Sequence, residues 1–327
     1  AMRPKLGLPT KTQIEVQTIF GNLAHSASSS IIIEYSDDAA DLPDGAAATG
    51  GSSTIGYNFS GTEVFGDHAQ FVMTTGTQAA NANGFFAYRI TATIALQTFY
   101  GPVHWAPLLP AAGVQYRSHT IGDSHLIVAL NGGTDDSVEA IQVQDASWDR
   151  IRALCNGDPL VHPRYGINIG DTFSFGQTTG LTLWPILADG SGLSNIGMSN
   201  IMTTAADSRN TLIAHLVNST CPFESVPQFE VLGNHAPYHW HGFSANNGGQ
   251  TNVAQWALDD LIEFKMIPHA SVLAGYSQPL AQEGRGHYAF ECGDTQIVVL
   301  NAGYDSERSG TNPYTGTYPI SLNAVSD

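Results

Sequence analysis

The first third of the chain alternates polar and apolar residues in short runs. The run Thr12–Ile19 alternates polar and apolar residues, as a strand with one buried face does. Ser30–Tyr35 is β-branched, and Gln70–Thr75 and Phe86–Ile94 are runs of similar kind. Loops rich in Gly, Ala, Ser and Asp separate them. Short strands between turn-rich loops predict an antiparallel β-sandwich.

The pattern changes near Leu108–Gly113, beyond which apolar strands alternate with helical spacing. Helical spacing is found over residues 147–154 and 208–217. The strands predicted around these helices are His119–Ile121, Tyr165–Ile169 and Phe229–Leu232. Such alternation is typical of a layered α/β domain. We therefore expect the α/β class, with a β-sandwich domain over residues 1–112 and a layered α/β domain over residues 113–327.

Bulk composition describes a globular and acidic protein. Of 327 residues, 42% are hydrophobic and 13% are charged, which leaves ample apolar surface to bury. The chain carries 29 acidic and 12 basic residues, a formal net charge of -17. Because such a surface repels phosphates, we expect no nucleic acid binding surface. No apolar run is long enough to span a membrane.

The cysteines and the N-terminus give information about the cellular location of the protein. Cys155, Cys221 and Cys292 form no Cys-x-x-Cys pair, so one thiol stays unpaired within the chain and one disulfide is left open. Ala1-Met2 resembles a cloning remnant in front of a trimmed mature sequence. Together with the acidic composition this favours an extracellular or periplasmic protein, and a cytoplasmic location is left open.

Three of the predicted strands end in the same way, with an apolar run, a glycine and a side chain that can bind metal. These ends are Gly122-Asp123-Ser124-His125, Gly170-Asp171 and Gly233-Asn234-His235. Glycine lets the chain turn sharply out of a sheet. Carboxylate and imidazole ligands together suit Zn, Fe or Mn. The pattern predicts a metal site beyond the strand ends.

A plain turn is the alternative interpretation of each segment. Gly-Asp is a common turn dipeptide and occurs elsewhere in this chain, at residues 66–67, 157–158 and 293–294. Gly-Asn-His directly after a strand is rarer. The order of the three segments on successive strands favours the metal site over chance.

In this order, the three segments resemble the opening motifs of the calcineurin-like (binuclear) metallophosphoesterases. Residues Val226–Leu232 are similar to the strand that leads into that family's Gly-Asn-His, and His287–Asn301 is similar to the aromatic strand pair that follows. The resemblance therefore runs from Ser118 to Asn301. A β-sandwich ahead of such a domain resembles the arrangement of purple acid phosphatases.

The resemblance implies a role for each motif residue. Asp123 and His125 would bind one divalent or trivalent metal ion (Mn, Zn or Fe), Asp171 would bridge two ions, and Asn234 would bind the second. His235 would be catalytic, stabilising the developing charge or protonating the leaving oxygen. A metal-bridging hydroxide would hydrolyse a phosphate mono- or diester.

The sequence departs from the family pattern after Asn301. The family's further histidine and its closing Gly-His-x-His segment are not found, and no histidine follows His287. Ala236 stands where the family usually has an acidic residue, and Ser174 stands where it often has an acidic, Asn or Tyr residue. The second metal site is therefore the less supported of the two.

Two explanations account for the missing motifs. The preferred one is that the α/β domain is incomplete at its C-terminus, with the remaining segment lost or present as a separate chain. Alternatively, His239 and His241 complete the site as additional ligands, since alternate residues of an extended segment point the same way. A polar loop beside the site would explain both histidines without metal.

Two further functions compete with a phosphoesterase. One is a non-catalytic extracellular binding or structural protein built on a degenerate phosphoesterase scaffold, because a fold does not guarantee an activity. The other is a carbohydrate-active β-protein, suggested by the aromatic residues Tyr57, Phe85 and Trp105. The substrate is not determined by the sequence.

Overall fold

The computed structural model describes residues 2–20, 30–58, 68–74, 80–94, 96–121, 146–169, 220–231 and 288–300, with residues 261, 262, 264, 266 and 267. All statements below concern these residues. The strands are β1 Met2–Pro9, β2 Gln13–Phe20, β3 Ser30–Ser36, β4 Ser53–Asn58, β5 His68–Thr74, β6 Phe85–Ile94, β7 Gln97–Tyr100, β8 His104–Pro107, β9 Arg117–Ile121, β10 Pro163–Asn168, β11 Gln228–Glu230, β12 Tyr288–Cys292 and β13 Thr295–Val299.

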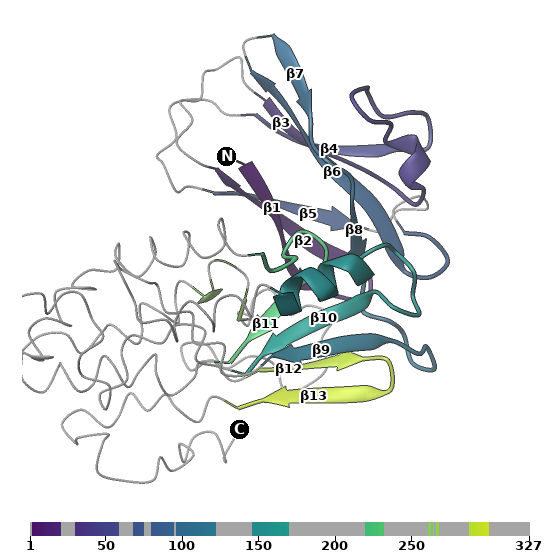
Figure 1. The fold of residues 1–327 in the computed structure, drawn as a ribbon, viewed down its shortest axis with the longest axis vertical. Helices are drawn as coiled ribbons and strands as arrows, with labels where there is room; N and C mark the ends of the chain where they lie inside the picture. The colour runs from purple at the N-terminus through teal and green to yellow at the C-terminus, as the bar shows by residue number, and fades with distance from the viewer. Residues whose placement is uncertain are drawn as a thin grey trace, which may run out of the picture.

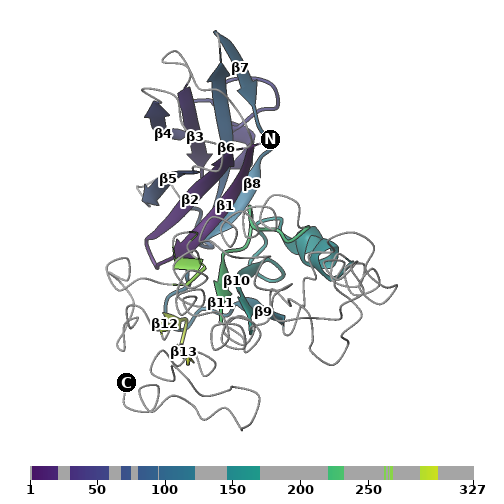
Figure 2. The same cartoon turned by 90° about the vertical axis from the view of Figure 1, so that its left-hand side faces the viewer.

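Two antiparallel sheets form the first part of the molecule (Figures 1 and 2). One has the order β1-β2-β5, and the other has the order β4-β3-β6-β7 with β8 also paired to β6. Alternate residues of the strands face a shared core, as the sequence pattern predicts. The core includes Leu6 and Val16 from the first sheet, and Ile33, Phe86 and Ile90 from the second. This packing is that of a β-sandwich.

Two smaller sheets follow. The strands β9, β10 and β11 are parallel and lie in the order β11-β10-β9, and β12 and β13 form an antiparallel hairpin. Aromatic side chains join the two sheets. The rings of Phe229 and Phe290 stack with centroids 4.1 Å apart, and Tyr165 meets Phe290 edge-on at 5.3 Å. Such aromatic pairs add to the free energy of burial.

The predicted α/β class is wrong. Within the described residues, regular structure is mainly β, and α-helix is confined to residues 146–154 and to two residues at 261–262, beside the 3-10 turn Ala39–Asp41. The helix expected over residues 208–217 lies outside the described residues. One face of the parallel sheet packs on the β12-β13 hairpin, where a layered α/β domain would have helices. The described part of the chain is therefore of the mainly β class.

The buried hydrophobic residues form two cores, and the change from one core to the other along the sequence lies near the expected domain boundary. One core contains residues between Leu6 and Leu108, and the other contains Leu109 and residues up to Val299. Leu8 belongs to the second core although it lies on β1. The division into domains at residues 112 and 113 stays a prediction.

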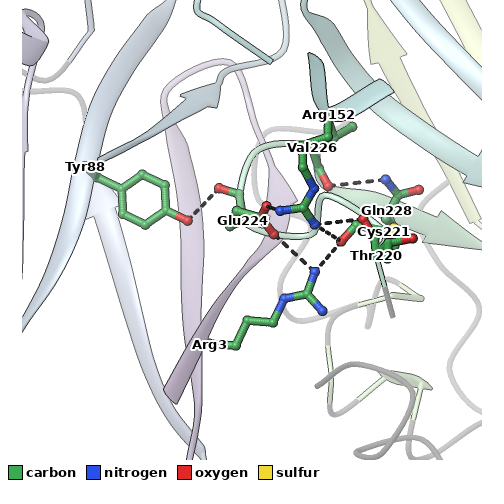
Figure 3. A network of polar contacts seen from close by, with 8 residues as sticks. All are labelled: Arg3, Tyr88, Arg152, Thr220, Cys221, Glu224, Val226 and Gln228. Carbon is green, nitrogen blue, oxygen red and sulfur yellow. Dashed lines mark hydrogen bonds and ion pairs between the residues drawn. The ribbon is translucent and has the colours of Figure 1, made fainter. Parts of the chain in front are cut away.

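A buried carboxylate, that of Glu224, joins the sandwich to the strand β11 (Figure 3). The side chain of Glu224 is 5% exposed and meets two guanidinium groups, Arg3 at 3.3 Å and Arg152 at 2.6 Å. Arg3 comes from β1 and Arg152 from the helix over residues 146–154. The hydroxyl of Tyr88, on β6, donates to the Glu224 carbonyl at 2.6 Å. One residue is therefore fixed from three elements.

Backbone contacts reinforce this junction. The Leu6 N–H donates to the Phe223 carbonyl at 2.7 Å, and Arg3 Nη2 donates to the Cys221 carbonyl. The buried Lys5 ammonium donates to the Phe264 carbonyl at 2.6 Å. Strand β1 thus pairs with β2 on one edge and holds residues 221–223 on the other.

His162 and Arg164, at the start of β10, form a second junction with the sandwich. The guanidinium of Arg164 lies 3.9 Å from the centre of the Phe85 ring and donates to the Gly84 carbonyl at 2.8 Å. The His162 ring packs on Phe85 at 4.8 Å. Strands β10 and β11 are both tied to the sandwich just before they enter the parallel sheet.

All three cysteines are free thiols in this structure. The disulfide that the sequence left open is therefore not formed. Burial raises the pKa of Cys155 and of Cys292 to about 12. Both thiols stay protonated at neutral pH and are poor nucleophiles.

The Glu224 junction predicts a large loss of stability in Glu224→Ala. Removing the carboxylate breaks two ion pairs of a buried charge, which lowers the free energy of unfolding by about 3 kcal/mol. Lys11→Ala is the control, because its ion pair with Glu291 is 40% exposed and contributes less than about 1 kcal/mol. Urea unfolding of both variants measures the difference. Equal losses would contradict the role given to Glu224.

Candidate metal centre

Strands β9, β10 and β11 end level with one another at one edge of the parallel sheet (Figure 1). Asn168 is the register partner of both Ile121 and Glu230. The ladder continues one residue further, since the Ile169 N–H donates to the Ile121 carbonyl at 2.9 Å and the Val231 N–H donates to the Asn168 carbonyl at 2.9 Å. The three predicted motifs follow these strand ends in the sequence.

The predicted ligands and the catalytic histidine lie outside the described residues. They are Asp123, His125, Asp171, Asn234 and His235, with the additional candidates His239 and His241. Their roles stay predictions. Among the residues that the structure describes, no group of three or more His, Cys, Asp or Glu side chains could hold a metal ion.

A row of three residues crosses the sheet behind its carboxyl edge. His119 on β9 and Gln228 on β11 are both register partners of Gly166 on β10. The His119 ring and the Gln228 amide meet above Gly166, with Nε2 3.3 Å from Oε1. A Cβ on residue 166 would lie 2.1 Å from His119 Nε2 and 2.3 Å from Gln228 Oε1. Glycine at position 166 therefore makes this contact possible.

The His119 ring is held neutral. Burial lowers the pKa of His119 to about 4, although the hydrogen bond with Gln228 acts in the opposite direction. Since the Gln228 oxygen can only accept, Nε2 carries the proton and Nδ1 is an acceptor. Within the described part of the chain, Nδ1 and the Trp148 indole N–H are buried and have no hydrogen-bond partner, and the two rings meet edge-on at 5.6 Å.

His162 is held neutral in a similar way. Its Nε2–H donates to the Ser225 carbonyl at 2.8 Å, while Nδ1 accepts from the Gly157 N–H at 3.0 Å. Burial lowers the pKa of His162 to about 4. Protonation of Nδ1 would break the bond from Gly157, so His162 belongs to the structural frame, as expected for an ordinary core histidine.

A second polar row lies nearer the strand ends. Asn168 is 5% exposed and Glu230 is 3% exposed, and the two are neighbours in register on β10 and β11. Sequence reasoning missed both residues. Alternation along Gln228-Phe229-Glu230 places the two polar side chains on one face and the phenylalanine on the other, and this was the available signal.

Of the three aromatic residues that suggested carbohydrate binding, Phe85 is not accessible to a ligand. Phe85 is fully buried between Arg164 and His162. Trp105 is half-buried, and its ring packs so closely on Gly157 that a Cβ there would lie 2.6 Å from it. The side chain of Tyr57 lies outside the described residues. Phe85 is a core residue, so the suggestion loses one of its three supports.

Comparison with known proteins leaves the family open. No protein-family model and no curated protein matches the chain. Two similar solved structures are of Bacteroides uniformis β-glucuronidase 2, one a calcium-binding mutant and one covalently bound to cyclophellitol-6-carboxylate aziridine. They are 8% and 9% identical, with TM-scores of 0.26 and 0.23, and the matches cover 80% of this chain.

The matched region covers 31% and 38% of the two glucuronidase chains, so this chain spans about a third of their length. Similarity at these TM-scores carries no argument about fold or activity. Within the described residues, no helix is long and apolar enough to cross a membrane.

The row above Gly166 predicts that Gly166→Ala destabilises the protein. The added methyl group would force His119 and Gln228 apart, and overpacking of this kind lowers the free energy of unfolding by roughly 1–3 kcal/mol. Gly50→Ala is the matched control, since no described atom lies within 4 Å of the point that a Cβ at residue 50 would occupy. Urea unfolding compares the two, and a Gly166→Ala variant as stable as Gly50→Ala would contradict the packing described.

The two neutral histidines predict a loss of stability in mild acid. Their folded pKa values, about 4, lie below the ordinary value of 6.5, so the unfolded chain binds protons first as the pH falls. Their contribution is complete above pH 6.5 and is lost between pH 6.5 and 4, at about 1.4 kcal/mol per pH unit for each histidine.

Chemical denaturation between pH 7 and pH 4.5 measures this slope. In His162→Gln, which cannot titrate, the slope should fall by about 1.4 kcal/mol per pH unit, whatever the starting stability of the variant. An unchanged slope would show that His162 is not held neutral in the folded protein.

Proposed function

We propose that this protein is a metal-dependent phosphoesterase, with its metal site at the shared carboxyl edge of β9, β10 and β11. The observation that carries the proposal is the parallel and level register of these strands. Each strand is followed directly by one of the three motifs. Ligand groups in sheets with parallel strands gather at the carboxyl ends in this way.

Chain connectivity supports a common site. Asp123 and Asp171 each follow the last described residue of their strand by two positions, and Asn234 follows Val231 by three. Two residues extend at most about 7.6 Å and three at most about 11 Å. Because neighbouring strands lie about 4.8 Å apart, the ranges open to the three side chains overlap.

The donor set fits hard or borderline cations. Two carboxylates, one imidazole and one amide oxygen suit Mn, Zn or Fe. Asp123 and His125 would hold one ion, Asn234 would hold the other, and Asp171 would contribute to both. The net charge of -17 favours cation binding and opposes the approach of a phosphate ester. Two bound cations would offset that repulsion and lower the pKa of a coordinated water.

The chain's own residues would then supply orientation and a proton. The His235 imidazole would hold a proton beside the leaving oxygen and deliver it as the ester bond breaks. Asp171 would be the ligand that the two metal positions share. The substrate class is a phosphate mono- or diester. An extracellular or periplasmic location belongs to the same proposal.

The test compares two isosteric changes in Gly-Asp dipeptides, Asp171→Asn and Asp294→Asn. Asp171→Asn should weaken Mn²⁺ binding by at least about 100-fold and abolish hydrolysis of a chromogenic phosphate ester. Asp294 is exposed and accepts from the Gly113 N–H, so Asp294→Asn should behave as the wild type. Binding is measured by calorimetry and turnover by product absorbance.

Metal removal is the accompanying control. Dialysis against a chelator should abolish hydrolysis, and added Mn²⁺ should restore it. Absence of Mn²⁺, Zn²⁺ and iron binding by the wild type, or full activity in Asp171→Asn, would refute the proposed function and favour a non-catalytic binding protein.

A further inference from the structure

The loop after the helix over residues 146–154 contains an Asn-Gly dipeptide, Asn156-Gly157. In such a dipeptide the backbone nitrogen of the glycine can attack the carbonyl carbon of the asparagine side chain, and ring closure expels ammonia. Glycine permits this approach because it has no Cβ. Asn156 is exposed to solvent. The reaction needs a base for the glycine N–H proton and a donor that stabilises the side-chain oxygen, and this part of the chain contains both.

The base is His162. The Gly157 N–H donates to His162 Nδ1 at 3.0 Å, and the Nε2–H of the same ring donates to the Ser225 carbonyl at 2.8 Å. Since the Ser225 oxygen can only accept, Nδ1 is the unprotonated nitrogen of the ring. The bond from Gly157 lies in the plane of the peptide group, so the faces of the Gly157 nitrogen stay open for its attack on carbon. A positioned imidazole of this kind is a general base.

The stabilising donor is the Asp158 N–H, which donates to Asn156 Oδ1 at 2.9 Å. Negative charge develops on this oxygen as the Gly157 nitrogen adds to the amide carbon, and a fixed N–H dipole lowers the energy of that state. A further hydrogen bond closes the loop, from the His162 N–H to the Asp158 carbonyl at 2.8 Å. Nucleophile, base and donor are therefore held within one hydrogen-bonded turn.

A second Asn-Gly dipeptide, Asn83-Gly84, provides an internal comparison. Asn83 is also exposed, and Gly84 has a positive φ of 73°, beside 81° for Gly157. The Gly84 N–H, however, donates to the Asn81 carbonyl at 2.9 Å, and a backbone carbonyl oxygen is not a base at neutral pH. The two dipeptides thus differ in the acceptor of the glycine N–H. The Asn-Gly dipeptides at residues 131–132 and 247–248 lie outside the described residues.

We propose that Asn156 is a modification site, at which His162 acts as the catalytic base for closure of a succinimide ring with Gly157. His162 Nδ1 takes the proton from the Gly157 nitrogen as the bond from that nitrogen to the Asn156 amide carbon forms. The proton then passes to the departing amide nitrogen, which leaves as ammonia. Water opens the ring at either of its carbonyl carbons and leaves aspartate or isoaspartate at position 156.

The modification acts on the junction between β10 and the sandwich. Both products add a negative charge, and isoaspartate also carries the side-chain carbon into the backbone, which moves the Gly157 N–H away from His162. The His162 ring packs on Phe85 at 4.8 Å, and the Trp105 ring packs on Gly157. Conversion of Asn156 therefore releases a contact beside the start of β10. This inference is independent of the proposed function.

The test is peptide mass spectrometry of the folded full chain during incubation at neutral pH. Conversion of Asn156 should be at least about 10-fold faster than conversion of Asn83, the matched control. In concentrated urea, where both turns are lost, the two rates should become similar. Raising the pH should speed Asn83 in proportion to the hydroxide concentration and should speed Asn156 less, because His162 removes the proton there.

His162→Gln removes the base and should slow Asn156 at least about 10-fold while Asn83 stays within about twofold of its wild-type rate. A variant that only loosens the fold would instead speed both sites, so Asn83 reports on folding in the same sample. Equal rates at Asn156 and Asn83 in the folded wild type, or an unchanged Asn156 rate in folded His162→Gln, would overturn the proposal.

Discussion

The Glu224 carboxylate is the constraint on which the arrangement of this protein depends. It lies in the segment before β11, and it is held by Arg3 from the sandwich and Arg152 from the helix (Figure 3). Two guanidinium groups on one carboxylate offset the desolvation that burial imposes on Glu224. Because Tyr88 fixes the Glu224 backbone as well, β11 enters the parallel sheet from a set position. Within the sheet, strand pairing then brings the ends of β9, β10 and β11 level.

The parallel sheet, which this junction holds in place, carries the candidate site at its carboxyl edge. Its aromatic face, with Phe229 stacked on Phe290, anchors it to the β12-β13 hairpin. Its polar face carries buried groups up to the edge that the motifs follow in the sequence. Gly166 lets His119 and Gln228 meet across the central strand, so the backbones of all three strands stay in close register. Gly166 in the sheet and the Glu224 junction thus both help to fix the positions of these strands.

Sequence reasoning found most strands and the order of the motifs, but not the layers. Alternation identified β2, whose Ile14 and Val16 are buried while Gln13 is exposed, and β-branched or strand-like runs identified β3, β5 and β6. Strand β1 was missed, since Pro4 and Pro9 argue against a strand and the chain start resembled a cloning remnant. Both prolines are tolerated because β1 lies at the edge of its sheet. The mainly β class was missed because the apolar face of Phe229 and Tyr165 has no signal that distinguishes a hairpin partner from a helix.

For the site, the glycine-containing motifs predict turns that lie outside the described residues, whereas Glu224 was invisible because its importance arises from burial between distant segments. The central claim is that the edge formed by β9, β10 and β11 holds metal. Anomalous scattering from a crystal grown with Mn²⁺ tests it most directly. The account predicts a peak at this edge, coordinated by the Asp171 carboxylate. A crystal with no anomalous peak at this edge, or with Mn²⁺ bound only elsewhere, would contradict it.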